Sequence, residues 1–340
     1  MSGLPEPRAN PLLLGQDAAE SALIEAMGGG RLAHAWLLLG PPGIGKATLA
    51  FRFARRLLAG NVTGEGLYLP PGNPTFRRVA AGSHADLLTV ERAWDEKRKK
   101  VRGEIVVDDV RRIADFLRRT PAEGGWRVVV LDGAEDLNRN AANALLKVLE
   151  EPPPRAVLLL ACSAAGRLLP TIRSRCRSLR LASLPVDDVT SLLGQAMPEL
   201  PADERRRVAA LSDGSIGYAL DLAREGGVGL AALVEQVLRS PADLTTAQAL
   251  QTADTLGREE EAFATFLDLL RAALSAAVRA VARGSADAAQ TRLVGHRPLA
   301  DWVAVWHALG SLQDATEGLH LDTREALVRG FRLLSGAANA

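Results

Sequence analysis

Residues 40–46 have the types and the spacing of a phosphate-binding loop. The seven residues are Gly40, Pro41, Pro42, Gly43, Ile44, Gly45 and Lys46, which match the pattern GxxxxGK. Glycines in such a loop let backbone amides turn inward around phosphate oxygens at the positive end of the next helix. Lys46 would supply a point charge for the outer phosphates. We therefore predict a nucleotide-binding site that also includes Ala47 and Thr48, with a simple glycine turn as the alternative.

The position after the lysine argues against a complete metal site. The motif requires Ser or Thr there, because that hydroxyl binds magnesium, and this chain has Ala47. Thr48 comes one residue late, and one step along a helix turns a side chain by about 100°. Thr48 is therefore a poor substitute. We predict that ATP or ADP can bind to the loop without being hydrolysed.

An acidic residue ends the apolar run VVVLD. The Asp132 carboxylate could hold a metal ion directly or through water, and the alternative is a strand-end residue that caps a turn. A hydrolase of this type usually has Glu in the next position to polarise the attacking water, whereas this chain has Gly133. Glu135 lies further along, where it need not reach the same point.

The elements around the loop indicate an α/β domain. Residues 17–27 have a helical pattern, residues 35–39 form an apolar run typical of a buried strand, and the segment after the loop has apolar residues at helical spacing. Further strands are predicted at 128–131 and 157–161. Strands that alternate with helices indicate a parallel sheet with helices on both faces. The stretch 61–102 is irregular in pattern, and we expect it to form insertions on that sheet.

The pattern changes from Pro185 onward to amphipathic helices without a convincing strand. We predict three domains, covering residues 1–182, 183–238 and 239–340. A length of 340 residues fits two or three domains, each able to bury its own core.

Composition excludes several classes of protein. The chain has 41 Lys plus Arg against 40 Asp plus Glu, so it is not expected to coat nucleic acid by bulk charge. Its 2 cysteines, Cys162 and Cys176, are too few for a disulfide framework or a four-thiolate zinc site, so we predict no structural metal. No apolar run approaches the roughly 20 residues that span a bilayer. We expect a cytoplasmic protein without a membrane partner.

Three segments identify a family. The segments NALLKVLEEPP (143–153), Ser174-Arg175-Cys176 and HAWLLLGPPGIGK (34–46) resemble the clamp-loader branch of the AAA+ ATPases. The segments GSHADLLTVER (82–92) and IVVDDVRRI (105–113), with LHLDTREALVRGF near the C-terminus, resemble its bacterial delta-prime branch. The resemblance covers nearly the whole chain.

The resemblance implies an architecture and a set of partners. It implies an α/β P-loop AAA+ domain with a parallel sheet, then a small helical lid domain, then an all-α collar that assembles five subunits. The implied partners are gamma/tau and delta subunits of the DNA polymerase III clamp loader, and through that complex the sliding clamp and primer-template DNA. The chain would then be an accessory subunit of the polymerase holoenzyme and not a catalyst by itself.

The resemblance also points to a third missing group. The segment LSDGSIGYAL (211–220) resembles the lid motif GSxRDAL, and Gly217 stands where a nucleotide-sensing arginine would be. Together with Ala47 and Gly133, this favours a subunit that does not hydrolyse ATP. The alternative is an ATP-hydrolysing gamma/tau-type subunit or a related AAA+ DNA-remodelling ATPase. A nucleotide-sensing scaffold outside replication is a third, weaker hypothesis.

Arg175 is the residue that we expect to take part in catalysis. By resemblance it would act in trans as an arginine finger at a neighbouring subunit's ATP site, because a guanidinium fork suits phosphate oxygens. The alternative is a surface arginine in an ion pair. Ser163 falls near the family's sensor position or forms a turn, and Cys176 is interpreted as a small buried apolar residue. The run 97–100 (KRKK) is interpreted as a solvated loop, with phosphate contact as the alternative.

Overall fold

The computed structural model describes residues 3–29, 32–60, 66–96, 99–123, 125–224, 226–257, 260–295, 297–319 and 321–336. The chain separates into two compact units. The first comprises Met1–Ala202 with Ser212–Tyr218, and the second comprises Asp203–Leu211 with Ala219–Ala340. The predicted three-domain division, with boundaries after residues 182 and 238, remains a prediction.

The first unit is built around a five-stranded parallel sheet. Its strands lie in the order β2 (Leu87–Val90), β5 (Arg127–Asp132), β6 (Ala156–Cys162), β1 (Ala35–Leu39) and β7 (Arg177–Arg180). The three central strands are continuous apolar runs, as expected for strands that are covered on both faces. The strands predicted at 35–39, 128–131 and 157–161 are confirmed.

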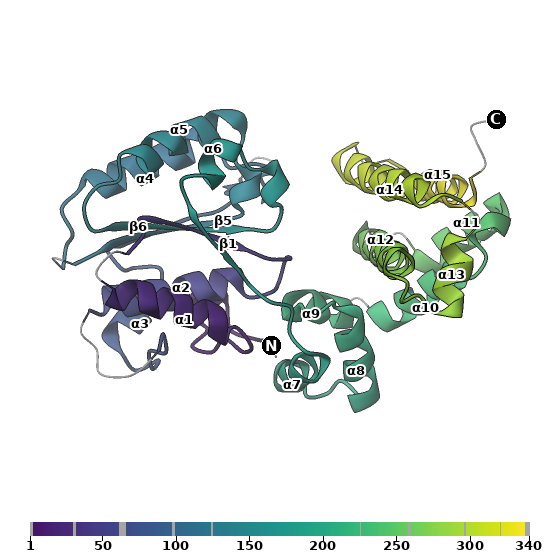
Figure 1. Cartoon of the computed structure of the whole chain (residues 1–340), viewed down its shortest axis with the longest axis horizontal. Coiled ribbons are helices and arrows are strands. Elements are labelled where there is room, and N and C mark those ends of the chain that lie inside the picture. Colours follow the sequence, from purple (N-terminus) through teal and green to yellow (C-terminus); the bar gives the residue numbers. More distant parts are fainter. Residues whose placement is uncertain are drawn as a thin grey trace. The chain divides into compact units, whose positions relative to one another are not determined.

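Helices cover both faces of this sheet (Figure 1). One face carries α1 (Asp17–Gly28), α2 (Lys46–Leu58) and α3 (Pro74–Ala80), and the other carries α4 (Val107–Arg118), α5 (Arg139–Glu150) and α6 (Pro170–Arg173). Side chains alternate along β1, so Trp36 packs into the first layer and Leu37 into the second. This unit also contains three short 3-10 turns and one further helix before residue 202: η1 (Pro7–Ala9), η2 (Ala134–Asp136), η3 (Ala165–Arg167) and α7 (Val186–Ala196).

The prediction that residues 61–102 are only irregular insertions is wrong. The segment supplies β2, which pairs in register with β5, and α3, which begins at an Asn73 cap that accepts a hydrogen bond from Thr75 N at 2.8 Å. The Pro and Asn that suggested a loop are helix-start residues here. A two-stranded hairpin, β3 (Trp94–Asp95) with β4 (Lys100–Val101), follows. Positions 61–65 and 97–98, including half of the basic run, lie outside the described residues.

The second unit is helical. It contains α10 (Gly227–Leu238), η4 (Pro241–Asp243), α11 (Thr246–Leu256), α12 (Glu260–Arg283), α13 (Ala288–Val294), α14 (Leu299–Leu319) and α15 (Thr323–Ser335), with α8 (Ala202–Leu211) and α9 (Ile216–Arg224) at the division between the units. Side-chain caps from Thr245, Asp287 and Asp322 begin three of these helices. In the part of the chain that the structure describes, no strand follows Arg180.

Trp302 lies in the core of the second unit. Its side chain is buried, and Nε1 donates a hydrogen bond to Val294 O at 3.1 Å. The Arg297 guanidinium stacks on its ring. These contacts place this tryptophan in the packed interior of the second unit. Among the helices that the structure describes, none combines the length and apolar character needed to cross a membrane.

Candidate functional site

The phosphate loop connects the carboxyl end of β1 to the first turn of α2. Gly43 has φ 72° and Gly45 has φ 103°, which are left-handed backbone conformations that favour glycine. Ile44 anchors the loop in the core at 1% exposure, and Thr48 is buried on α2. Residues 40–48 thus form a loop that leads into the first turn of α2. Nucleotide binding by this loop stays a prediction.

The Lys46 ammonium is hydrogen-bonded within the protein. It donates to Gly40 O at 2.8 Å, Pro41 O at 2.7 Å and the Ser163 hydroxyl at 2.8 Å. These three acceptors match the three N–H donors of a lysine. Burial lowers the pKa of Lys46, and the charges of Glu135 and Asp132 oppose that shift. A phosphate group would have to replace acceptors that the chain already provides.

Two carboxylates lie near this lysine, one of which the sequence reasoning undervalued. Burial raises the pKa of Asp132, Glu91 adds to the rise, and Lys46 opposes it. Glu135 lies on η2 and accepts a hydrogen bond from Ser163 N at 2.8 Å. Ser163 thus links the lysine to Glu135, whose reach the sequence had left open. Gly133, at φ 79°, precedes the 3-10 turn on which Glu135 lies. A glycine at this point is the feature of the sequence that indicates a tight turn.

Residues 212–218 pack against the outer side of the phosphate loop. The Ser215 hydroxyl donates to Pro42 O at 2.7 Å, and Gly217 N donates to Gly43 O at 3.0 Å. With the two Lys46 bonds, four consecutive carbonyls from Gly40 to Gly43 are therefore hydrogen-bonded. Such bonds hold the loop in one conformation and add to its order.

Gly217 has a packing role that the sequence did not reveal. A Cβ atom added there would lie 2.5 Å from Gly43 Cα, and a Cβ atom on Gly43 would lie 2.6 Å from the Ser215 hydroxyl. The two backbones approach at a distance that only glycine allows. A side chain as large as arginine at position 217 would not fit this arrangement, because the two backbones are in direct contact there.

The phosphate loop lacks the hydroxyl that usually binds magnesium after the lysine. Ala47 supplies no oxygen, and Lys46 is engaged with the loop itself. Among the described residues, no group of three or more His, Cys, Asp and Glu side chains is placed to hold a metal ion. Burial raises the pKa of both Cys162 and Cys176 to about 12, so these thiols stay protonated near neutral pH.

Arg175 lies in the turn between α6 and the edge strand β7. Its Nη2 is 2.8 Å from Glu150 Oε1, and its Nη1 donates to Thr171 O at 3.1 Å. The side chain remains 35% exposed and that of Glu150 50% exposed, and an ion pair of this kind is worth about 0–1 kcal/mol. The ion pair named as the alternative is therefore present. A guanidinium has five N–H donors, so these two contacts leave donors for a further partner.

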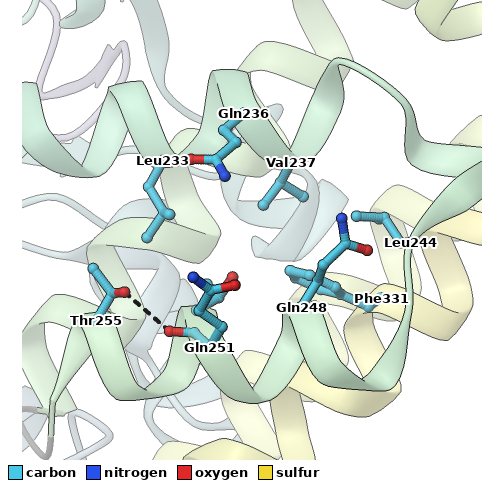
Figure 2. Close-up of a pocket in the computed structure, with 9 residues that line it drawn as sticks. Leu233, Gln236, Val237, Leu244, Gln248, Gln251, Thr255 and Phe331 are labelled. Atoms are coloured by element: carbon cyan, nitrogen blue, oxygen red, sulfur yellow. Dashed lines mark hydrogen bonds between the residues drawn. The ribbon is translucent and has the colours of Figure 1, made fainter.

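A pocket in the second unit differs in chemistry from the phosphate loop (Figure 2). It lies among α10, α11 and α15 and is lined by Gln236, Gln248 and Gln251 beside Leu233 and Phe331. The Thr255 hydroxyl donates to Gln251 O at 2.9 Å. None of the described residues that line this pocket is ionisable, so it offers no general acid or base.

A parallel sheet with a phosphate loop and an acidic strand end defines an α/β P-loop type of protein. Residues 15–185 match the model of the family described as DNA polymerase III, delta subunit. The chain belongs to this family. The clamp-loader assignment and the AAA+ fold class predicted from the sequence are confirmed.

Curated relatives include both delta-prime and tau subunits. The chain is 40% identical over 198 residues to DNA polymerase III subunit delta' of Pseudomonas aeruginosa, which is 58% of each chain. It is 34% identical over 206 residues to the delta' subunit of Escherichia coli, 59% of this chain and 57% of that one. The tau subunit of Salmonella typhimurium is 34% identical over 217 residues, 62% of this chain and 32% of that one. The matches thus span less than two thirds of these relatives.

Solved structures of lower identity are also similar. A DNA polymerase III gamma subunit-related protein of Thermotoga maritima aligns at a TM-score of 0.43 and 18% identity, covering 93% of this chain and 99% of that one. The RuvB Holliday junction branch migration motor of the same organism aligns at 0.42 and 17%, covering 97% and 92%.

Proposed function

We propose that this chain is a delta-prime-type subunit of the DNA polymerase III clamp loader. It would assemble with gamma/tau and delta subunits in the cytoplasm, and the complex would load the sliding clamp on primed DNA. In this proposal the chain does not hydrolyse ATP itself and supplies Arg175 to the ATP site of a neighbour. Family membership and the delta-prime relatives support the assembly role.

One observation carries the proposal that the chain lacks its own ATPase activity. The phosphate loop is hydrogen-bonded from within: Lys46 binds its own loop and Ser163, and Gly217 packs on Gly43. Binding of ATP or ADP requires Lys46 to exchange the Gly40 and Pro41 carbonyls for phosphate oxygens. The Gly43 to Lys46 amides would then hold the phosphates.

Hydrolysis would still lack three groups. The magnesium hydroxyl is absent at Ala47, the water-orienting acid is absent at Gly133, and the sensor arginine is absent at Gly217. Each such group acts on charge that develops in the transition state, and the loss of one typically costs on the order of a hundredfold. The loss of all three leaves no useful turnover.

The test is steady-state ATP hydrolysis by the purified chain, with and without primed DNA, beside the Lys46→Ala variant. We expect no turnover above background in either protein. Turnover that Lys46→Ala abolishes would refute the proposal. Co-purification with gamma/tau and delta subunits, followed by native mass measurement, tests assembly separately, and failure to join the complex would refute that role.

An ATP-hydrolysing gamma/tau-type subunit is the second candidate. The tau relatives favour it, and so does Glu135, because this acid reaches Ser163 beside Lys46. In that case Glu135 would replace the missing acid at Gly133. The same hydrolysis assay separates the two candidates, and Glu135→Gln would abolish turnover only under the second.

A further inference from the structure

We infer that Glu150 is a positioning residue for Arg175, holding its guanidinium in the orientation in which it acts on a neighbour's phosphate. The inference rests on the proposed role of Arg175 in trans. It gives a function to the first acidic residue of the LEEPP segment, which neither the phosphate loop nor the sheet core uses.

The position of Glu150 is the first observation. Glu150 is the last residue of α5, and Glu151 follows it as the cap residue. The carboxyl end of a helix carries partial negative charge, so carboxylates are unfavourable there and Lys or Arg is preferred. This helix has an acid where its own dipole disfavours one. Arg175, which reaches this end from another segment, compensates that charge.

The geometry at Arg175 is the second observation. Nη2 contacts Glu150 Oε1 at 2.8 Å while Nη1 donates to Thr171 O at 3.1 Å. The guanidinium is therefore fixed at two of its nitrogens, by two different helices, α5 and α6. A planar group held at two points has a defined plane, whereas a single bond would leave it free to rotate.

The remaining donors are the third observation. Two of the five N–H groups are used in these contacts, and the side chain keeps 35% of its surface exposed. The free donors are the ones that can bind a phosphate of another subunit. The contacts with Glu150 and Thr171 are partly exposed, and an ion pair of this kind is weak. The Arg175 guanidinium therefore keeps its charge available for a phosphate.

Pre-orientation lowers the entropy that the side chain must lose in the transition state. Removing the Glu150 charge should therefore lower kcat at the receiving ATP site about two- to fivefold with little change in KM, a far smaller loss than removal of Arg175 itself. Glu150→Gln keeps the size of the side chain. Glu151→Gln is the matched control, because Glu151 is the next residue and forms no ion pair within the described part of the chain.

The experiment uses the full complex with ATP-hydrolysing clamp-loader subunits and compares Glu150→Gln, Glu151→Gln, Arg175→Ala and the Glu150→Gln/Arg175→Ala double variant. Clamp- and DNA-stimulated kcat and KM are measured, with the unfolding temperature of each chain. We expect Glu150→Gln to lower kcat in the parent and to have no effect when Arg175 is absent. This loss of additivity is a result that a merely structural role would not give.

Three other results would contradict the role of Glu150 or the proposed role of Arg175. If Arg175→Ala lowers kcat but Glu150→Gln does not, the inference is wrong and the proposed function stands. If Glu150→Gln lowers kcat equally without Arg175, or raises it, Glu150 does not position the arginine. If Arg175→Ala has no effect, the proposed finger role is wrong and the inference falls with it.

Discussion

The phosphate loop and the Arg175 turn lie in the same unit but use their polar groups in opposite ways. Around the loop, Lys46 and four consecutive carbonyls find partners within the chain. At Arg175, two contacts orient the side chain and leave donors exposed. The polar groups of the phosphate loop are already paired within the chain, whereas N–H donors of Arg175 remain available to a partner. This contrast is the one that the proposed function predicts for a subunit that does not hydrolyse ATP and supplies Arg175 to a neighbour.

The largest effect should come from the exposed side of this comparison. We expect Arg175→Ala to leave folding and assembly intact and to slow hydrolysis at the receiving ATP site about a thousandfold. Single-turnover hydrolysis by the reconstituted complex measures this. Arg173→Ala is the control, because Arg173 is exposed two residues earlier on α6. Equal hydrolysis rates for complexes with Arg175→Ala and with Arg173→Ala would refute the proposed role of Arg175 at a neighbour's ATP site.

The next largest effect concerns the packing of Gly217 against the phosphate loop. Gly217→Ala should destabilise the chain by about 1–3 kcal/mol, because the new Cβ meets Gly43 Cα and overpacking carries a cost of that size. Gly229→Ala on α10, where nothing lies within 4 Å of the added Cβ, should instead stabilise by about 0.4–1 kcal/mol. Urea denaturation measures both. If the two variants behave alike, the close contact between residues 43 and 217 does not hold the loop.

The smallest effect is a pH dependence at Asp132. Burial raises the pKa of this carboxyl, so the folded state binds its proton more tightly than the unfolded chain does. This stabilising contribution is fully present below the ordinary Asp pKa and is lost as the pH rises through the raised value. Asp132→Asn should therefore remove part of the decline in unfolding free energy as the pH rises from about 4 through the raised pKa of this carboxyl. Denaturant titrations across this range measure the difference, and parallel curves would contradict a buried acid.

Local pattern was enough to predict the central strands, the loop and α2, because their apolar runs and glycines depend on neighbours in sequence. Arg175 lies just before the edge strand β7, in the turn that follows α6. Local pattern did not predict β2, because these four residues form a strand only through their pairing with β5. It failed for Ser215 as well, since the hydrogen bond to Pro42 O joins residues 173 positions apart. Glu135 was undervalued because a 3-10 turn, and not a strand, determines where it points.

The contact between Gly43 and Gly217 also bears on how this chain could change. Because a Cβ at position 217 would lie 2.5 Å from Gly43 Cα, one substitution cannot introduce an arginine there without a rearrangement. The segment 212–218 would first have to withdraw, breaking the bonds from Ser215 and Gly217 to the loop. A change of Gly217 to arginine alone should therefore give a less stable protein. Under the proposed function, a selection experiment for ATP hydrolysis should recover paired changes in the loop and the 212–218 segment before any arginine at 217.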